Sequence, residues 1–171
     1  MNSSSGGLTD SIRKLERAID SSSSDLPDDV FLFLSRVTPL VNVDLLIQDD
    51  ARRTLLTWRA DEFYGPGWHV PGGIIRFQER AEERIRFVAH QELGAAVEFD
   101  AGPHRVLESI AVERRDRGHF ISLLYRCRLT QAPDPRLEHR DGVPLPGQWR
   151  WHSSCPGELI QEQRLYADLL E

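Results

Sequence analysis

Alternating apolar and polar residues predict β-strands through the middle of the chain. In residues 38–48 every second residue is apolar, namely Val41, Val43, Leu45 and Ile47. This period of two puts these side chains on one face of a strand and leaves Asn42 and Asp44 on the other. Apolar segments bounded by turn residues predict further strands at residues 54–59, 68–70, 95–99, 105–113, 119–130 and 148–152.

Four other segments repeat apolar residues at helical spacing. In residues 79–93 the apolar positions lie on one side of a helix, and Gly94 follows as the residue just past the cap. Residues 27–36 begin with Pro27, which suits a first helical turn. Residues 156–170 predict a closing helix, and a short N-terminal helix is predicted by Leu8, Ile12, Leu15, Ala18 and Ile19.

These elements predict an α+β domain, an α/β/α sandwich in which a mixed sheet lies between helices and the helix at residues 79–93 is central. A chain of 171 residues suits one domain. We assign it to residues 26–171. Residues 1–25 are expected to form a flexible extension, with disorder at 1–7, the short helix, and a serine-rich linker at 21–25. We interpret this extension as a docking or dimer element.

Composition limits the partners. A net charge of −6 argues against nucleic acid. No run approaches the ~18 apolar residues of a membrane span, and the N-terminal MNSSSGG is too polar for a signal peptide. Cys127 and Cys155 make neither a disulfide framework nor a metal pair. We expect a soluble, cytoplasmic protein whose ligands are small molecules.

A carboxylate in line with the apolar side of the central helix is the first candidate for chemistry. Glu92 lies in the last helical turn, where the helix dipole disfavours negative charge. A bare carboxylate there is costly unless a cation or several donors meet it. Glu92 therefore either bends outward to pair with an arginine such as Arg84 or Arg86, or holds a hard metal ion beside the Pro-Gly-Gly loop.

The spacing around Glu92 resembles the Nudix box, which is glycine, five residues, glutamate, seven residues, then Arg-Glu-apolar-any-Glu-Glu-any-Gly-apolar. Gly73 and Glu79 match the first two fixed positions, and Glu92 and Gly94 match the end. Three positions depart from the pattern, because Phe87, Val88 and Gln91 stand where the box has Arg, Glu and Glu. Only Glu92 remains of the acidic cluster at the end of the helix.

The depleted cluster indicates one Mg²⁺ ion, for which Mn²⁺ is expected to be able to substitute. Nudix enzymes that attack phosphorus generally gather two or more ions with the full cluster, because both the attacking and the leaving oxygen need stabilising. A single glutamate holds one Mg²⁺, whose remaining ligands are substrate phosphates and waters. One ion makes a diphosphate a better leaving group and does less to activate a nucleophile at phosphorus.

Residues 26–170 are similar to the GDP-mannose mannosyl hydrolase branch of the Nudix family. The similarity is carried by the segments TPLVNVDLLI, LLTWR, GPGWHVPGG, ELG, the HF that opens a strand, and the late WRW. It implies hydrolysis of a nucleotide sugar such as GDP-mannose by water attack at the anomeric carbon, which releases free sugar and nucleoside diphosphate. We also expect a homodimer.

The resemblance implies roles for individual residues. Glu92 and the backbone carbonyl of Gly72 would hold the metal. Arg59 would contact the diphosphate or help its departure, and Asp44 would lie in the sugar or leaving-group site. From the residues alone, Arg59 could equally be a solvated arginine at a strand end, and Asp44 a solvent-exposed residue on a polar face.

The catalytic base is expected in the loop before the last strand, where related enzymes place a histidine beside a metal-binding glutamine. A gapless match puts Leu145 and Pro146 at those positions, and neither can do the chemistry. A longer loop instead offers Glu138 as metal ligand and His139 as base, since the pKa of histidine lies near neutrality.

Substrate binding is assigned to three further residues. Arg76 is close to Ile74, which stands where this branch has an arginine, and is expected to substitute for it. His119 and Phe120 open the strand at residues 119–130 and are expected to face the substrate. Phe120 replaces a tyrosine, so one hydroxyl is lost from the expected site.

Two other functions stay open. The first is an ordinary Nudix diphosphatase that releases nucleoside monophosphate and sugar phosphate, against which the depleted box argues. The second is a non-catalytic nucleotide-sugar binding protein, favoured by the replaced residues Ile74, Val88, Gln91 and Phe120. The retained Glu92 argues against this second reading.

Overall fold

The computed structural model describes residues 4–20 and 26–170. The predicted serine-rich linker at residues 21–25 therefore lies outside the described residues. Contacts between residues divide the chain into two compact units. The smaller comprises Met1–Leu40 with Ile110–Phe120, and the larger comprises Val41–Ser109 with Ile121–Glu171.

The smaller unit contains helices α1 (Ser4–Asp20) and α2 (Asp28–Val37). The helix predicted at residues 27–36 is present as α2, with Pro27 at its N-cap instead of in its first turn. Helix α1 begins earlier than predicted, so the expected disorder is wrong for residues 4–7, while residues 1–3 lie outside the described part of the chain. Its hydrogen-bonding extends over this turn, where Ser11 Oγ donates to the carbonyl of Gly7 at 2.9 Å. An ion pair between Arg36 and Asp116 joins α2 to the turn at residues 111–118.

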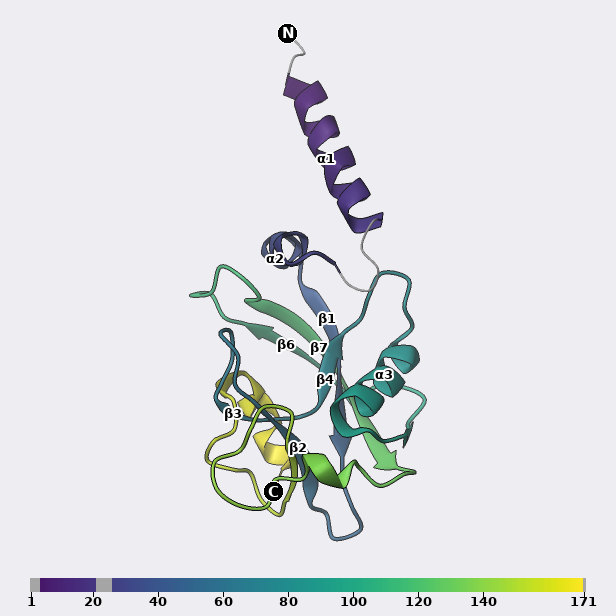
Figure 1. The fold of residues 1–171 in the computed structure, drawn as a ribbon, viewed down its shortest axis with the longest axis vertical. Coiled ribbons are helices and arrows are strands. Elements are labelled where there is room, and N and C mark those ends of the chain that lie inside the picture. Colours follow the sequence, from purple (N-terminus) through teal and green to yellow (C-terminus); the bar gives the residue numbers. More distant parts are fainter. Residues whose placement is uncertain (1–3, 21–25, 171) are drawn as a thin grey trace. The chain divides into compact units, whose positions relative to one another are not determined.

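The larger unit is built on two sheets (Figure 1). The first has the order β4 (Gly72–Ile74), β1 (Leu40–Ile47), β7 (His119–Leu129) and β5 (Val97–Phe99), and β6 (Arg105–Ile110) also pairs with β7. The second has the order β3 (Gly67–His69), β2 (Thr54–Arg59) and β8 (Trp149–His152). The pairs β1–β4, β2–β3, β2–β8 and β5–β7 are antiparallel. Isolated parallel bridges join Trp68 to Leu159 and Glu138 to Trp149.

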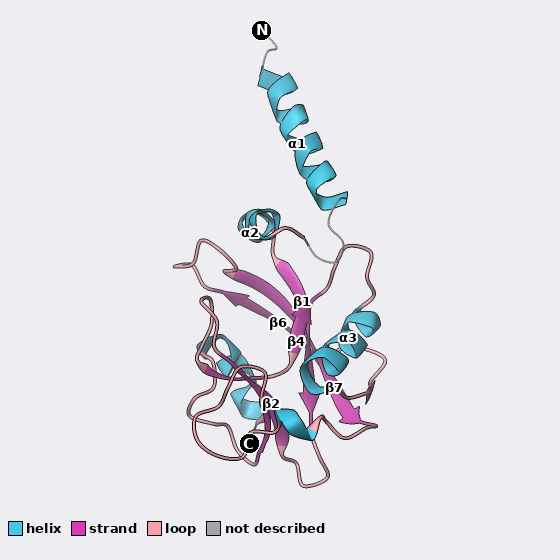
Figure 2. Cartoon of the chain, viewed as in Figure 1, coloured by secondary structure: helices cyan, strands magenta, loops and turns pink. Residues whose placement is uncertain are grey.

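The predicted elements are largely present, as Figure 2 shows, with helix α3 (Ala81–Leu93) at the centre of the sequence. Strand β4 was expected to be loop, because its Gly72 and Gly73 carry no side-chain pattern. The predicted closing helix is instead a 3-10 helix, η2 (Gln161–Leu169), and another, η1 (Pro135–Leu137), lies in the segment before the last strand.

Strand β1 separates two hydrophobic clusters. Val43, Leu45 and Ile47 pack into one cluster with α3, whereas Leu46 packs into the other with η2. Both faces of the strand are therefore covered. The polar alternation suggested that Asp44 faces solvent, but this carboxyl is only 2% exposed.

Helix α3 ends at a glycine that the local geometry requires. Gly94 has φ +61°, and its N–H bonds to the carbonyls of Ala89 and His90. The left-handed backbone is unfavourable for residues that carry a Cβ. A Cβ at this position would also lie 3.1 Å from Cβ of Asp134.

We predict that Gly94→Ala lowers the free energy of unfolding by roughly 1–2 kcal/mol, because alanine is strained in the left-handed region. Gly102→Ala is the matched control, since a Cβ at Gly102 meets no atom within 4 Å. Urea denaturation of both variants measures the difference. Equal stability of the two variants would contradict this account of the cap.

Candidate functional site

Glu92 reaches from the last turn of α3 to strands β2 and β4. Its Oε2 lies 3.0 Å from the hydroxyl of Thr57, and its Oε1 accepts the N–H of Gly72 at 3.3 Å. The alternative pairing with an arginine is not formed: Arg84 pairs with Glu79 at 2.8 Å and Arg86 with Glu82 at 3.5 Å. Within residues 4–20 and 26–170, Glu92 has no ion-pair partner.

Burial raises the pKa of Glu92 to about 7. Hydrogen bonds from Thr57 and Gly72 and the positive charge of Arg59 oppose this rise, whereas the charge of Asp44 adds to it. The groups around Glu92 therefore compensate its negative charge only in part.

Asp44 lies on the other side of Gly72. The two residues are paired across strands β1 and β4, and a side chain at position 72 would overlap Oδ1 of Asp44. Asp44 accepts hydrogen bonds from the Nδ2 of Asn42 at 2.7 Å and from the hydroxyl of Tyr166. Burial raises the pKa of Asp44 to about 6. Glycine is thus needed at this position for the carboxyl to approach the β4 backbone.

Tyr166 was not identified from the sequence as a site residue. It is 1% exposed in η2, and its hydroxyl binds a carboxyl 122 positions earlier in the chain. The only sequence signal was a tyrosine within the apolar pattern of the closing segment. Its partner depends on how that segment packs against β1.

The donors around Gly72 fit a divalent cation. The carboxyl groups of Asp44, which is buried, and Glu92, which is half-buried, flank this glycine, and their described hydrogen-bond partners are uncharged. Oxygen ligands of this kind suit Mg²⁺. Across the part of the chain that the structure describes, no group of three or more His, Cys, Asp or Glu side chains is placed to hold a metal.

Arg59 is held in place at the end of β2. It forms an ion pair with Asp61, and its guanidinium lies over the ring of Tyr64, 4.7 Å from the centroid. Its side chain is 31% exposed. Arg59 is therefore a partly buried, fixed cation near Glu92, and the alternative of a free solvated arginine does not hold.

His69 extends the site, although it was not selected from the sequence. Its Nε2 lies 3.1 Å from Oγ1 of Thr57, and its Nδ1 lies 2.9 Å from the carbonyl of Val70. A carbonyl only accepts, so Nδ1 carries a hydrogen. Burial lowers the pKa of His69 to about 4. The Thr57 hydroxyl thus lies between the carboxyl group of Glu92 and a neutral imidazole. The contact with His69 follows from the pairing of Thr57 with His69 across strands β2 and β3.

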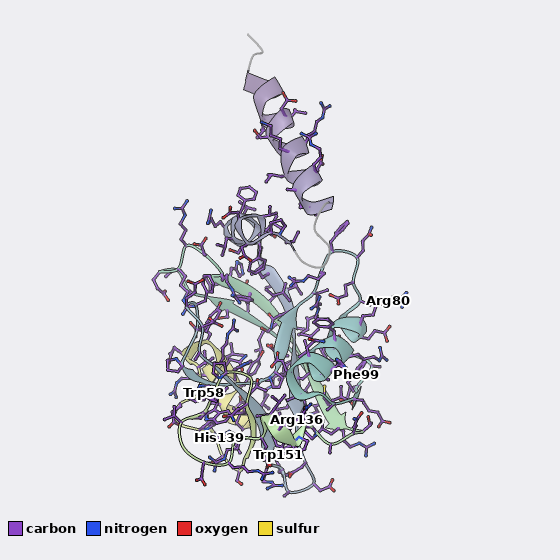
Figure 3. The ribbon with its side chains drawn as sticks, viewed as in Figure 1. Trp58, Arg80, Phe99, Arg136, His139 and Trp151 are labelled. Atoms are coloured by element: carbon purple, nitrogen blue, oxygen red, sulfur yellow. The ribbon has the colours of Figure 1, made fainter. Side chains whose placement is uncertain are left out.

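His139, the predicted base, lies elsewhere. It is 7% exposed, and its ring stands 5.8 Å from that of Trp68. Both residues line a cavity of about 430 Å³ with Trp58. Figure 3 labels Trp58 and His139. Trp68 and His69 are neighbours on β3, so their side chains point to opposite faces. The structure therefore places His139 on the face opposite to the His69 contact with Thr57.

The other predicted residues are not brought to Glu92 by described contacts. Glu138 pairs with Arg140 at 3.0 Å. Arg76 lies in the loop before α3 and donates its backbone N–H to Glu79. His119 and Phe120 open β7 and belong to the smaller unit. The roles assigned to these residues stay predictions.

Comparison with known proteins identifies the fold. No family model matches the chain. A low-salt glycan biosynthesis protein, Agl8 of Haloferax volcanii, is 28% identical over 113 residues, which cover 64% of this chain and 72% of that protein. A MutT Nudix hydrolase from Burkholderia pseudomallei superposes with a TM-score of 0.60 at 23% identity, covering 78% of this chain and 99% of its own.

A UDP-X diphosphatase superposes with a TM-score of 0.56 at 18% identity, covering 94% of this chain and 77% of its own. These likenesses show that the chain has the Nudix fold, and the predicted α+β class is confirmed. Among the described residues no helix has the length and apolar character needed to cross a membrane.

The pKa of Glu92 predicts a pH-dependent stability. It rises from an ordinary 4.5 to about 7 on folding, so the folded state binds this proton more tightly. The free energy of unfolding therefore falls as pH rises through this window. Without divalent metal, the stability of Glu92→Gln relative to wild type should increase by roughly 1–3 kcal/mol between pH 4.5 and pH 8.

Urea denaturation in chelator across this pH range measures the effect. The control is Glu82→Gln, which changes a half-exposed glutamate on the same helix and should show little pH dependence. A flat difference between Glu92→Gln and wild type would mean that Glu92 is ordinarily solvated.

Proposed function

We propose that this protein is a Mg²⁺-dependent hydrolase of nucleotide sugars, in which water attacks the anomeric carbon of the sugar. The observation that carries the proposal is the pair of carboxyl groups beside Gly72, those of the buried Asp44 and the half-buried Glu92. Two carboxyl groups suit a single cation. Attack at phosphorus generally uses two or more ions, which a full acidic cluster holds. The Nudix fold supports hydrolysis as the reaction class.

The metal would be held by the Glu92 carboxylate and the carbonyl of Gly72, with oxygens of the substrate completing its shell. When bound, it would neutralise charge on the diphosphate and make this group a better leaving group. Glu138 would be a further ligand only if its ion pair with Arg140 opened. Thr57 and Gly72 orient the Glu92 carboxylate through the hydrogen bonds described above.

Arg59 supplies a fixed positive charge for the diphosphate. Asp61 and Tyr64 restrict its guanidinium, so little side-chain entropy is lost when it binds phosphate oxygens. In the reaction, the bond between the anomeric carbon and the diphosphate oxygen breaks, and its electron pair stays on the diphosphate. Arg59 would stabilise the charge that develops there.

Asp44 would accept a hydrogen bond from the sugar or from the attacking water. Its pKa of about 6 leaves it mostly ionised at neutral pH, while Tyr166 and Asn42 fix its orientation. The assignment of the base to His139 stays a prediction from the sequence. Because His139 lines the cavity on the other face of the β3–β2–β8 sheet, we propose Asp44 as the base instead. If Asp44 is the base, its substitution should abolish the reaction, whereas substitution of His139 should do so if His139 is the base.

The comparisons support a nucleotide-sugar substrate through two names. The relative Agl8 is a glycan biosynthesis protein, and UDP-X diphosphatase acts on a nucleoside diphosphate compound. The second name also favours the alternative of an ordinary diphosphatase, which would cleave between the phosphates. A non-catalytic binding protein is the third possibility.

Turnover in ¹⁸O-labelled water separates these functions. Purified protein is incubated with Mg²⁺ and a panel of nucleotide sugars led by GDP-mannose, and the products are analysed by mass spectrometry. We expect free sugar and unlabelled nucleoside diphosphate. Label in a nucleoside monophosphate or sugar phosphate would establish the diphosphatase, label in the nucleoside diphosphate would establish attack at phosphorus, and binding without turnover would favour the non-catalytic protein.

Substitution of the two carboxyl groups tests the site itself. Glu92→Gln should lower kcat by roughly 100-fold or more, because it removes the anionic metal ligand, and Glu82→Gln should retain wild-type turnover. Asp44→Asn should lower kcat, while His139→Gln should leave it within a fewfold of wild type. Loss of turnover in His139→Gln, with Asp44→Asn active, would instead assign the base to the loop histidine.

A further inference from the structure

Helix α1 (Ser4–Asp20) carries a regular apolar stripe that the nucleotide-sugar site does not use. Its members are separated by four, three and four residues: Leu8, Ile12, Leu15 and Ile19. This is the spacing of a coiled-coil seam. In heptad notation the two isoleucines occupy a positions and the two leucines occupy d positions.

The stripe is exposed over most of its length. Leu8 is 66% exposed, Ile12 47% and Leu15 39%, whereas Ile19 is half-buried. Apolar side chains on one line of an isolated helix gain free energy when another apolar surface covers them. Most of the stability of a helix in a protein comes from packing of its apolar face, so pairing along this stripe would stabilise α1.

The identity of the seam residues indicates which surface covers them. Isoleucine at a with leucine at d favours two parallel strands over higher oligomers. The flanking g and e positions hold Ser11, Glu16, Thr9 and Ala18, so a symmetric parallel pair brings no like charges together across the seam.

The remaining charges argue against other occupants. Three basic residues, Arg13, Lys14 and Arg17, are balanced by three acidic ones, Asp10, Glu16 and Asp20. A helix that lies on an anionic membrane is typically rich in lysine and arginine on its polar face. The balanced charge of α1 provides no such attraction, and favours a second helix of the same kind.

We propose that α1 of one chain pairs with α1 of a second copy as a parallel two-stranded coiled coil, which makes the protein a dimer. Four seam layers, from Leu8 to Ile19, form the contact. The proposal gives the expected homodimer a specific surface in the N-terminal extension. It stands independently of the catalytic proposal, because it rests on different residues and its test measures mass.

Sedimentation velocity of the full chain over a range of protein concentrations tests the dimer. Wild type should sediment as a dimer, and Ile12→Glu should raise the dissociation constant at least ~10-fold, because it buries a charge at an a position in both copies. Lys14→Glu is the matched control, since it changes charge on the same helix away from the seam. A monomeric wild type, or a dimer that persists unchanged in Ile12→Glu, would overturn the proposal.

Crosslinking tests the parallel orientation. In a background with Cys127→Ala and Cys155→Ser, Ile12→Cys places two thiols side by side only if the helices run parallel. Oxidation should then give a disulfide-linked dimer from this variant alone. If a crosslink instead requires mixing Ile12→Cys with Leu15→Cys, the helices are antiparallel and the proposed orientation is wrong.

Discussion

The close approach of two poorly solvated carboxyl groups to one glycine is the constraint on which the site depends. Asp44 and Glu92 both lie against Gly72, and burial raises the pKa of each. Ionising both in a poorly solvated space is unfavourable unless positive charge compensates them. The described partners are a threonine, an asparagine, a tyrosine and a backbone N–H, all neutral. The arrangement is consequently stable as a cation site or as a partly protonated pair.

The fold brings these groups together through strand β1 and helix α3. One side of β1 packs on α3 and the other on the cluster that includes η2, so a polar residue on either side is buried. Glu79 holds the loop before α3 through its contacts with Arg76 and Arg84. Glu79, the first glutamate of the box pattern, is therefore engaged in structural contacts, and Glu92 is the glutamate of the pattern that lies at the candidate site.

The sequence predicted what local pattern determines. The strands at residues 54–59 and 40–47, the helix that ends before Gly94, and the candidate metal ligand Glu92 all follow from periodicity, capping and spacing. The burial of Asp44 could not be predicted, because the segment that covers its face of the strand lies more than a hundred residues away in the sequence. The same holds for the β4 strand, whose glycines carry no pattern and are paired only through β1.

Long-range register explains the other differences. The contact of His69 with Thr57 exists because β2 and β3 pair in one specific register, which no local signal encodes. The position of His139 depends on the path of the loop that carries it. Its place next to Glu138 in the sequence gave no sign that its ring lies beside Trp68. Tyr166 likewise required the packing of η2.

The most direct test of the account is the titration of the Glu92 carboxyl by ¹³C NMR, with Glu92→Gln used to assign its resonance. The account predicts a pKa near 7 without divalent metal and a pKa well below the ordinary value once Mg²⁺ is added, because a bound cation favours the charged form. An ordinary pKa that does not respond to Mg²⁺ would contradict both the burial of this carboxyl and its role in holding a metal.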